Sequence, residues 1–476
     1  MGGRSEALES GGVAAHEVLA RAHRGTRVMT ARVAAMRVIS VSANLLLVLL
    51  VTPRELGLLA VARGTFTLLQ YAAELGVGKA LLRRAAVPTR EEYAALSGLQ
   101  LAVGVVIVMA GLGWPPLVLG FGAIDRSFHL PMLGTVVTML SLAWGTGARV
   151  RLERALAYER LAAVDVANVL MLNVGLVACA AFGVFVPGAF VVLGVSTVVS
   201  NLMLHHWAPG PAPTLAIAPL RGVMRDSGGF LVASSLMVAR EQGTAVVVGL
   251  LFGLPTAGVY SFAERVAQVL NICFDGYKNA AIPAASRLAG EAAALRSLAT
   301  RVLSGSIALV APCTVLGVIL LPAAAPWLPR WAPAIVLTQW YMLAFGLFGV
   351  MLATLDPISV ARRGAVVAMW ENGLALLAGW GAFALLAWLH SSRLEMAVVA
   401  MYVIPSLALV ALTPAAIRPA LEPGARRSLA LSAGGLLIFL ALRVAGAPVW
   451  SRVATAALLP ALALGRTAWQ VLQARR

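Results

Sequence analysis

The chain contains two similar stretches, PRELGLLAVARGTFTLLQYAAE (residues 53–74) and LPTAGVYSFAERVAQVLNICFD (residues 254–275). The second can be laid on the first at an offset of 201 residues, and polar residues then recur at matching positions. The matched pairs are Gly57 with Gly258, Ala62 with Ala263, Arg63 with Glu264, Thr67 with Gln268, Gln70 with Asn271, and Glu74 with Asp275. The chain is therefore predicted to contain an internal repeat.

The polar residues of each stretch share one face of a helix. Counted from Arg63 or Glu264, they follow 4, 7 and 11 residues later, which places them within about 60° of one another at 3.6 residues per turn. Lys278 extends the second row by a further turn. An ionised group at the centre of a bilayer costs about 2.5–3.5 kcal/mol, so these rows indicate either a function or a compensating set of partners.

The composition is that of an integral membrane protein. Hydrophobic residues make up 60% and charged residues 12% of the 476 positions, against about 45–50% and about 25% in a soluble domain. The mean hydropathy is +0.87, and the apolar runs are continuous, which predicts spanning helices rather than a β-barrel. The basic residues behind the net charge of +17 lie mostly in short loops, as the positive-inside rule expects, so we predict no nucleic-acid partner.

At about 20 residues per span, the sequence predicts an all-α membrane protein with about 14 transmembrane helices. The predicted spans are 33–52, 58–82, 94–118, 129–148, 161–185, 188–207, 229–252, 257–282, 302–321, 333–355, 366–389, 396–416, 429–445 and 453–470. The loops rich in arginine place both termini in the cytoplasm and the protein in the cytoplasmic (inner) membrane.

The spans group into two lobes. We predict a cytoplasmic tail over residues 1–32, an N-lobe of six helices over 33–207, a cytoplasmic linker over 208–228 and a C-lobe of six helices over 229–417. Residues 418–476 add two helices and a short cytoplasmic tail. An offset of six spans preserves topology, so the lobes would be parallel repeats about an axis along the membrane normal. The second and eighth spans should then face each other across a wet central cavity.

Other ionisable residues also fall inside predicted spans. Arg240 and Glu241 form a predicted buried pair in the seventh span, and Asp165 and Glu371 lie near the starts of the fifth and eleventh spans. A structural role is the alternative, because hydrogen bonds between membrane helices contribute about 0.6 kcal/mol on average. Asp275 and Lys278 would form an ion pair of this kind, and acids are favoured at helix N-termini in any case.

Three stretches resemble the bacterial polysaccharide-export and lipid-linked oligosaccharide flippases, in the superfamily that includes multidrug and toxin extruders. They are PRELGLLAVARGTFTLLQYAAELGVGKALLRR (53–84), RALAYERLAAVDVANVL (154–170) and LFGLPTAGVYSFAERVAQVLNICFDGYKNAAIPAASRL (251–288). The resemblance covers roughly the first twelve spans, and its motifs are mainly structural. It implies that a polyprenyl-diphosphate-linked glycan is moved between leaflets as two lobes rock about the cavity.

That substrate suggests two sets of site residues. Guanidinium, ammonium and amide groups suit a diphosphate and a sugar, and the candidates are Arg37, Arg63, Gln70, Arg240, Arg265, Gln268, Asn271 and Lys278. Carboxylates would take up coupling ions, and the candidates are Glu74, Asp165, Glu241, Glu264, Asp275 and Glu371. No cofactor, metal or catalytic residue is predicted, apart from coupling to a proton or sodium gradient. The expected partners are the lipid-linked glycan, the bilayer and other membrane proteins of polysaccharide assembly.

Three alternatives stay open. A multidrug or cation antiporter of the same fold would need a net acidic, aromatic cavity, whereas these spans carry at least as many cations as acids. A lipid II (peptidoglycan precursor) flippase would share the fold, and in such flippases the two additional spans are thought to help form a groove for the lipid tail. A membrane-embedded glycan-assembly enzyme is less favoured, because it needs a catalytic group on an external loop, and Asp125 and Glu395 are poor isolated candidates.

Overall fold

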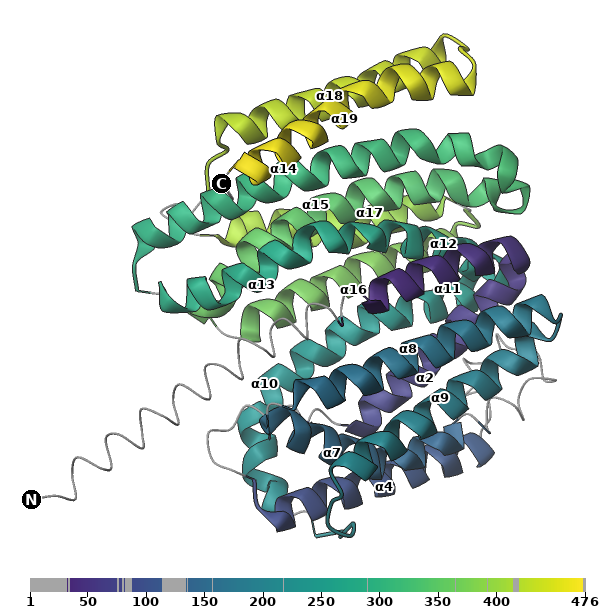
Figure 1. The fold of residues 1–476 in the computed structure, drawn as a ribbon, viewed down its shortest axis with the longest axis vertical. Helices are drawn as coiled ribbons and strands as arrows, with labels where there is room; N and C mark the ends of the chain where they lie inside the picture. Colours follow the sequence, from purple (N-terminus) through teal and green to yellow (C-terminus); the bar gives the residue numbers. More distant parts are fainter. Residues whose placement is uncertain are drawn as a thin grey trace, which may run out of the picture. The chain divides into compact units, whose positions relative to one another are not determined.

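All regular structure in the described part of the computed structural model is helical (Figure 1). The described residues are 32, 35–74, 77–78, 81, 88–113, 134, 136–155, 157–216, 218–288, 290–363, 365–391, 393–413 and 419–473. Within them, eight helices are long and apolar enough to cross a membrane, and Ala35–Leu50 is a shorter apolar helix. Each of the 14 predicted spans overlaps a helix in these ranges. Asp125 and the predicted tail, apart from Arg32, lie outside them.

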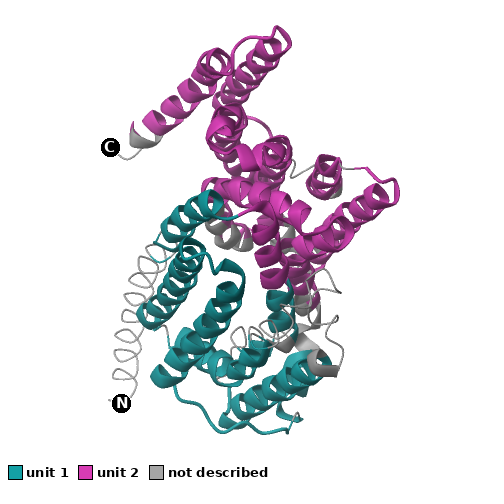
Figure 2. Cartoon of the chain, turned by 90° about the vertical axis from the view of Figure 1, so that its right-hand side faces the viewer, with its two compact units in different colours: residues 1–51, 65–231 teal, residues 52–64, 232–476 magenta. Residues whose placement is uncertain are grey.

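The chain forms two compact units (Figure 2). Unit 1 comprises residues 1–51 and 65–231, and unit 2 comprises residues 52–64 and 232–476. Helix α2 (Pro53–Glu74) therefore contributes its first half to unit 2. The other helices of unit 1 are α4 (Arg90–Gly113), α7 (Leu142–Arg154), α8 (Tyr158–Ala181), α9 (Phe185–Trp207) and most of α10 (Arg221–Val238), with the short segments η2 (Thr138–Ser141) and η3 (Ala218–Leu220).

In unit 1, α8 lies along α9, and α7 contacts α4, α8 and α9. The apolar core between α7, α8 and α9 consists of Ala148, Leu152, Leu161, Val164 and Leu204. Two arginines at the end of α7 bind backbone oxygens: Arg151 donates to the Ala208 carbonyl, and Arg154 donates to the Leu81 carbonyl at 3.0 Å. These arginines, which the sequence assigned to a basic loop, therefore also tie helix ends together.

Unit 2 holds the remaining helices. They are α11 (Thr244–Phe252), α12 (Leu254–Ala267), α13 (Asn271–Arg287), α14 (Ala292–Ala324), α15 (Ala332–Arg363), α16 (Ala365–Trp388), α17 (Leu394–Leu412), α18 (Pro423–Val444) and α19 (Val449–Gln473), with the short segments η4 (Ala239–Gly243), η5 (Gln268–Leu270), η6 (Ala325–Trp327) and η7 (Pro329–Trp331). Helix α15 contacts α12, α13, α14 and α17, while α16 packs on α11 and α17. The hairpin of α18 and α19 packs on α14 (Figure 1).

The two stretches of the repeat meet at a pair of equivalent glycines. A Cβ atom added at Gly57 would overlap the carbonyl oxygen of Leu254, and one added at Gly258 would overlap the carbonyl oxygen of Pro53. The first half of α2 and the start of α12 thus approach backbone to backbone, which only residues without a side chain permit. The sequence predicted that these helices face each other across a wet central cavity. Within unit 2 their N-terminal parts lie in direct backbone contact, and the cavity stays a prediction.

Proline residues inside α14 leave backbone oxygens that other helices satisfy. A proline removes the N–H that would bind the carbonyl four residues earlier, so Pro312 frees the Ala308 oxygen and Pro322 frees the Val318 oxygen. The Ser428 hydroxyl of α18 donates to the Ala308 oxygen at 3.1 Å. The Thr467 hydroxyl of α19 shares its single proton between the Ala308 oxygen at 3.2 Å and the Ala463 oxygen of its own helix at 2.9 Å. The amide of Gln339 in α15 donates to the Val318 oxygen at 2.8 Å. Such bonds are the known way in which membrane helices tolerate proline.

Two spans predicted as continuous α-helices are interrupted. The seventh span contains a π-helical turn, η4 (Ala239–Gly243), and the eighth contains a 3₁₀ turn, η5 (Gln268–Leu270). Both interruptions coincide with predicted polar residues, since η4 carries Arg240 and Glu241 and η5 begins at Gln268. Departures of this kind inside α-helices often mark functional sites.

Candidate functional site

Four ionisable side chains from four elements gather inside unit 2. They are Arg240 on η4, Lys278 on α13, Asp356 on α15 and Glu371 on α16, and we call them the unit 2 charge cluster. The Lys278 Nζ atom lies 3.4 Å from the Asp356 Oδ2 atom. The Glu371 carboxyl group lies within electrostatic range of the other three side chains. Two cations and two carboxylates make the cluster formally neutral, which is the condition under which a membrane protein tolerates buried charge.

Three members of the cluster are buried and the Lys278 side chain is 26% exposed, but the cluster is not saturated with hydrogen bonds. Arg240, Glu371 and Asp356 are 7%, 5% and 8% exposed. Nevertheless, the Nη1 atom of Arg240 and the Oε1 atom of Glu371 are buried without a hydrogen-bond partner among the described residues. Leaving a buried polar atom unpaired costs about 1–3 kcal/mol, more for a charged group, so these two atoms are the natural places for a ligand or an ion.

Arg240 is held by its surroundings rather than by one strong ion pair. Its guanidinium carbon lies 4.9 Å from the centre of the Phe348 ring, a cation–π arrangement. Its Nη2 atom is 3.4 Å from the Glu241 Oε1 atom, but the Glu241 side chain is 47% exposed. The predicted buried pair is therefore corrected: only the arginine is buried, because the wider π-helical turn separates the directions of the two side chains.

A chain of three buried tyrosines runs beside the cluster. The hydroxyl groups of Tyr260 and Tyr341 are 3.4 Å apart, and those of Tyr341 and Tyr402 are 2.7 Å apart. These side chains come from α12, α15 and α17 and are 0%, 1% and 5% exposed. A hydrogen-bonded network in a low-dielectric interior holds its members rigidly, so the three tyrosines link α12 to α15 and α17.

A second set of charges lies at the start of the polar row in α12. Glu264 has Arg265, Glu241 and Arg63 as its charged neighbours, and we call these four residues the Glu264 group. The Arg63 side chain is exposed, whereas Glu264 and Arg265 are half-buried. Arg63 belongs to unit 2 through the first half of α2, so the two repeat-equivalent residues Arg63 and Glu264 are electrostatic neighbours within one unit. This group too contains two cations and two carboxylates.

The other predicted site residues divide between the two units. Arg37, Gln70 and Asp165 lie in unit 1, while Gln268 and Asn271 lie half-buried in η5 and α13 of unit 2. The side chains of Glu74 and Asp275 lie outside the described residues. Lys278, for which the sequence suggested Asp275 as a partner, pairs with Asp356 of a different helix.

Asp165 in unit 1 is surrounded by arginine. The Nη2 atom of Arg149 donates to its Oδ2 atom at 2.7 Å, and the Nη2 atom of Arg32 lies 3.2 Å from the same oxygen. Arg149 also reaches Glu153 at 3.4 Å. These contacts favour the structural alternative for Asp165, because its carboxylate is already neutralised by two guanidinium groups.

The sequence interpretation missed Asp356 and all three tyrosines. Asp356 stands one residue beyond the end predicted for the tenth span, whereas α15 continues to Arg363. A buried carboxylate directly before Pro357 was the available signal. Tyr341 and Tyr402 each lie singly in an apolar run, and no sequence pattern indicates that their hydroxyl groups meet. Among the described residues, no group of three or more His, Cys, Asp or Glu side chains is arranged to hold a metal ion.

Comparison with known proteins identifies the fold and the family. A family model described as "Polysaccharide biosynthesis protein" matches residues 46–327. A structure of the lipid II flippase MurJ in an inward closed conformation has a TM-score of 0.70 at 11% identity, covering 93% of this chain and 98% of that one. An inward-facing multidrug resistance MATE family transporter of the MOP superfamily has a TM-score of 0.59 at 15% identity, covering 77% of this chain and 91% of that one. No curated protein matches this sequence significantly.

Proposed function

The chain belongs to the polysaccharide biosynthesis protein family, and on that premise we propose that it is a flippase for a polyprenyl-diphosphate-linked oligosaccharide. It is a multi-pass membrane protein with the fold of MOP-superfamily transporters, not of an enzyme family. In the proposed cycle, the glycan precursor crosses the cytoplasmic membrane by alternating access, and both termini face the cytoplasm.

The observation that carries the proposal is the unit 2 charge cluster. Arg240 and Glu371 are buried, and each has one polar atom without a hydrogen-bond partner among the described residues. Arg240 lies on the π-helical turn η4, where the span departs from α-helical geometry. A structural cluster would be expected to close all of its hydrogen bonds, whereas a transport site must leave some of them for its passenger. Guanidinium groups bind diphosphate oxygens in pairs, so Arg240, Lys278, Arg63 and Arg265 are assigned to the diphosphate.

The carboxylates are assigned to resetting the carrier. Glu371 has Asp356 and the two cations Arg240 and Lys278 as charged neighbours, and Glu264 and Glu241 belong to the Glu264 group. When the diphosphate leaves, these acids neutralise the remaining cations or take up protons or sodium ions. Outward movement of an anion is favoured by about 2.3 kcal/mol per charge for each 100 mV of a negative-inside potential. The potential therefore drives the loaded step, and the acids govern the return.

The balance of charge distinguishes this function from drug export. A carrier of organic cations needs an excess of carboxylates at its site, whereas the unit 2 charge cluster and the Glu264 group each contain as many cations as acids. The tyrosine chain adds hydroxyl groups suited to sugar or phosphate oxygens, but the hydrogen bonds between the tyrosines are already formed. The described charges thus lack the excess of carboxylates that an organic cation would need, while they include the cations that a diphosphate requires.

The test is a translocation assay in proteoliposomes with a labelled short-chain polyprenyl-diphosphate sugar. Arg63→Ala and Arg240→Ala should abolish translocation, because each removes a cation from the proposed diphosphate site. Arg330→Ala is the matched control, since Arg330 is exposed on η7 and belongs to neither charge group. Arg240→Lys keeps the positive charge but loses the paired N–H donors, so it should retain a small part of the translocation activity. That remaining activity would show that a substitution at this position does not prevent folding.

The outcomes separate the candidate functions. Normal translocation by both alanine variants after correct membrane insertion would refute the assignment of the cluster. If the wild-type protein exchanges organic cations for protons but does not move the lipid-linked sugar, the protein is an antiporter instead.

A further inference from the structure

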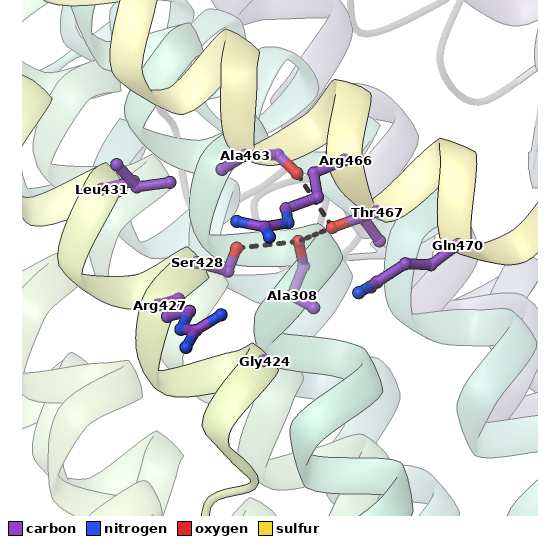
Figure 3. A pocket seen from close by; sticks show the side chains of 9 residues that line it. All are labelled: Ala308, Gly424, Arg427, Ser428, Leu431, Ala463, Arg466, Thr467 and Gln470. Carbon is purple, nitrogen blue, oxygen red and sulfur yellow. Dashed lines mark hydrogen bonds between the residues drawn. The ribbon is translucent and has the colours of Figure 1, made fainter.

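The hairpin of α18 and α19 carries a small basic pocket that neither charge group explains (Figure 3). The pocket has a volume of about 60 Å³ and lies against Ala308 of α14. Arg427 of α18 and Arg466 of α19 line it from two sides, and Gln470 lies one turn beyond Arg466. Figure 3 shows the nitrogen-bearing ends of these three side chains reaching toward the same space. Among the described residues, no acidic side chain lines the pocket.

The two arginines are set in place by the proline in α14. Arg427 directly precedes Ser428, and Arg466 directly precedes Thr467. Both hydroxyl groups donate to the Ala308 oxygen that Pro312 leaves free, at 3.1 and 3.2 Å (Figure 3). The backbone on each side of the pocket is therefore tied to one point on α14. Three helices therefore meet at the pocket, and the two arginine side chains that line it are exposed.

The charge and size of the pocket define what it can hold. Neither Arg427 nor Arg466 has an ion pair in the described part of the chain, so together they present two positive charges. By this measure of volume one water molecule needs about 10–15 Å³, so the pocket has room for a few water molecules. This space accommodates one small anionic group but not a sugar chain. Two guanidinium groups with no acid between them match a phosphate.

The surroundings indicate that the phosphate is carried by a lipid. Large apolar side chains at the same ends of α18 and α19 are exposed, namely Leu429, Leu462 and Trp469. Tryptophan is enriched at the membrane interface, and basic pockets between spanning helices on the cytoplasmic side bind anionic lipid head groups. The positive-inside distribution predicts that this end of the hairpin is cytoplasmic.

We propose that Arg427 and Arg466 bind the phosphate of an anionic glycerophospholipid of the cytoplasmic leaflet, with Gln470 at the edge of the site. The pocket holds the head group, and the acyl chains lie along the exposed apolar side chains of the hairpin. A bound lipid would fasten the hairpin to α14 at the membrane surface. The site does not depend on what the protein transports.

The test is native mass spectrometry of the purified full-length protein titrated with phosphatidylglycerol, with phosphatidylcholine as the comparison of zero net charge. An arginine near an anionic lipid contributes about fivefold in affinity. Arg427→Gln/Arg466→Gln should therefore weaken phosphatidylglycerol binding by about 25-fold, and each single variant by about fivefold. The matched control is Arg443→Gln/Arg452→Gln, which removes two charges from the opposite ends of the same two helices and should bind like the wild type.

Each contrary result has a defined meaning. Unchanged phosphatidylglycerol binding in the double variant, or equal binding of phosphatidylcholine by the wild type, would overturn the proposal. Saturable binding of inorganic phosphate by delipidated protein, lost in the double variant, would assign the site to a soluble phosphate compound. Tighter retention of a polyprenyl phosphate than of phosphatidylglycerol would assign it to the transported lipid instead. If the double variant does not fold, the two single variants decide the question.

Discussion

The ion pair of Lys278 and Asp356 allows the unit 2 charge cluster to be dissected one charge at a time. Lys278→Met leaves one cation, Arg240, with two carboxylates, whereas Asp356→Asn leaves two cations with Glu371. Removing one partner of a buried ion pair costs about 3–5 kcal/mol, because the other charge stays buried and uncompensated. We expect Lys278→Met to fall at the upper end of that range, since it also leaves Asp356 and Glu371 to repel each other.

Asp356→Asn should cost less than Lys278→Met. This variant loses the 3.4 Å contact between Asp356 and Lys278. The cost is partly offset, because the repulsion between Asp356 and Glu371 disappears. The double variant restores a neutral pair of Arg240 and Glu371, so its cost should be below about 2 kcal/mol. Because Lys278→Met alone would cost about 5 kcal/mol, the coupling energy between the two substitutions should be at least about 3 kcal/mol, at or above the upper end of the usual range.

The assay is equilibrium unfolding in mixed detergent micelles, with translocation measured on the same preparations. Arg330→Met is the control for loss of a cation at an exposed position. The double variant should be nearly as stable as the wild type yet inactive in transport, because its stability recovers while the diphosphate has lost a cation. Additive single effects, or a Lys278→Met protein as stable as the wild type, would refute the reasoning. An active double variant would show that the cluster is structural only.

Three further predictions follow from contacts in the two units. Gly258→Ala should greatly reduce the yield of folded protein in size-exclusion chromatography, because its Cβ would overlap the Pro53 oxygen, whereas Gly381→Ala, which meets open space, should not. Ser428→Ala/Thr467→Val should lower the free energy of unfolding by about 1–3 kcal/mol, because the Ala308 oxygen is left without a hydrogen-bond donor. Adding Pro312→Ala should recover most of this loss, since it returns the missing backbone N–H. If stability does not recover, Pro312 is not the reason that the Ala308 oxygen needs these hydroxyl groups. Asp165→Asn should lower thermal stability but leave the ion dependence of transport unchanged, because Asp165 pairs with Arg149 and Arg32; an altered ion dependence would contradict the structural role.

The sequence predicts the helices of this fold well because burial in a membrane leaves a long apolar signal. The repeat offset also identifies Gly57 and Gly258, which meet in unit 2. The interruptions at η4 and η5 could not be predicted, since a single extra or missing backbone position does not change the hydropathy of a span. The partners of the Ala308 oxygen lie 120 and 159 residues away along the chain, beyond any local pattern.

For the candidate site, the sequence indicated most of the charged residues but not their pairing. Arg240, Lys278 and Glu371 stand out as charges in apolar spans, and the structure brings them together. Asp356 was missed because hydropathy places the end of a span too early when a carboxylate follows it. The sequence suggested Asp275 as a partner of Lys278 because the two lie one turn apart on a helix. The Asp275 side chain lies outside the described residues, and the contact that the structure describes is made between α13 and α15.

The most direct measurement of the central claim is the affinity of the purified protein for a short-chain polyprenyl-diphosphate sugar, compared with the matching monophosphate. If the cations of unit 2 hold the diphosphate, the wild type should prefer the diphosphate, and Arg240→Ala should lose at least about tenfold in affinity and most of that preference. Arg330→Ala should bind as the wild type does. Equal binding of the two lipids by the wild type, or an Arg240→Ala protein that binds as tightly as the wild type, would contradict the account.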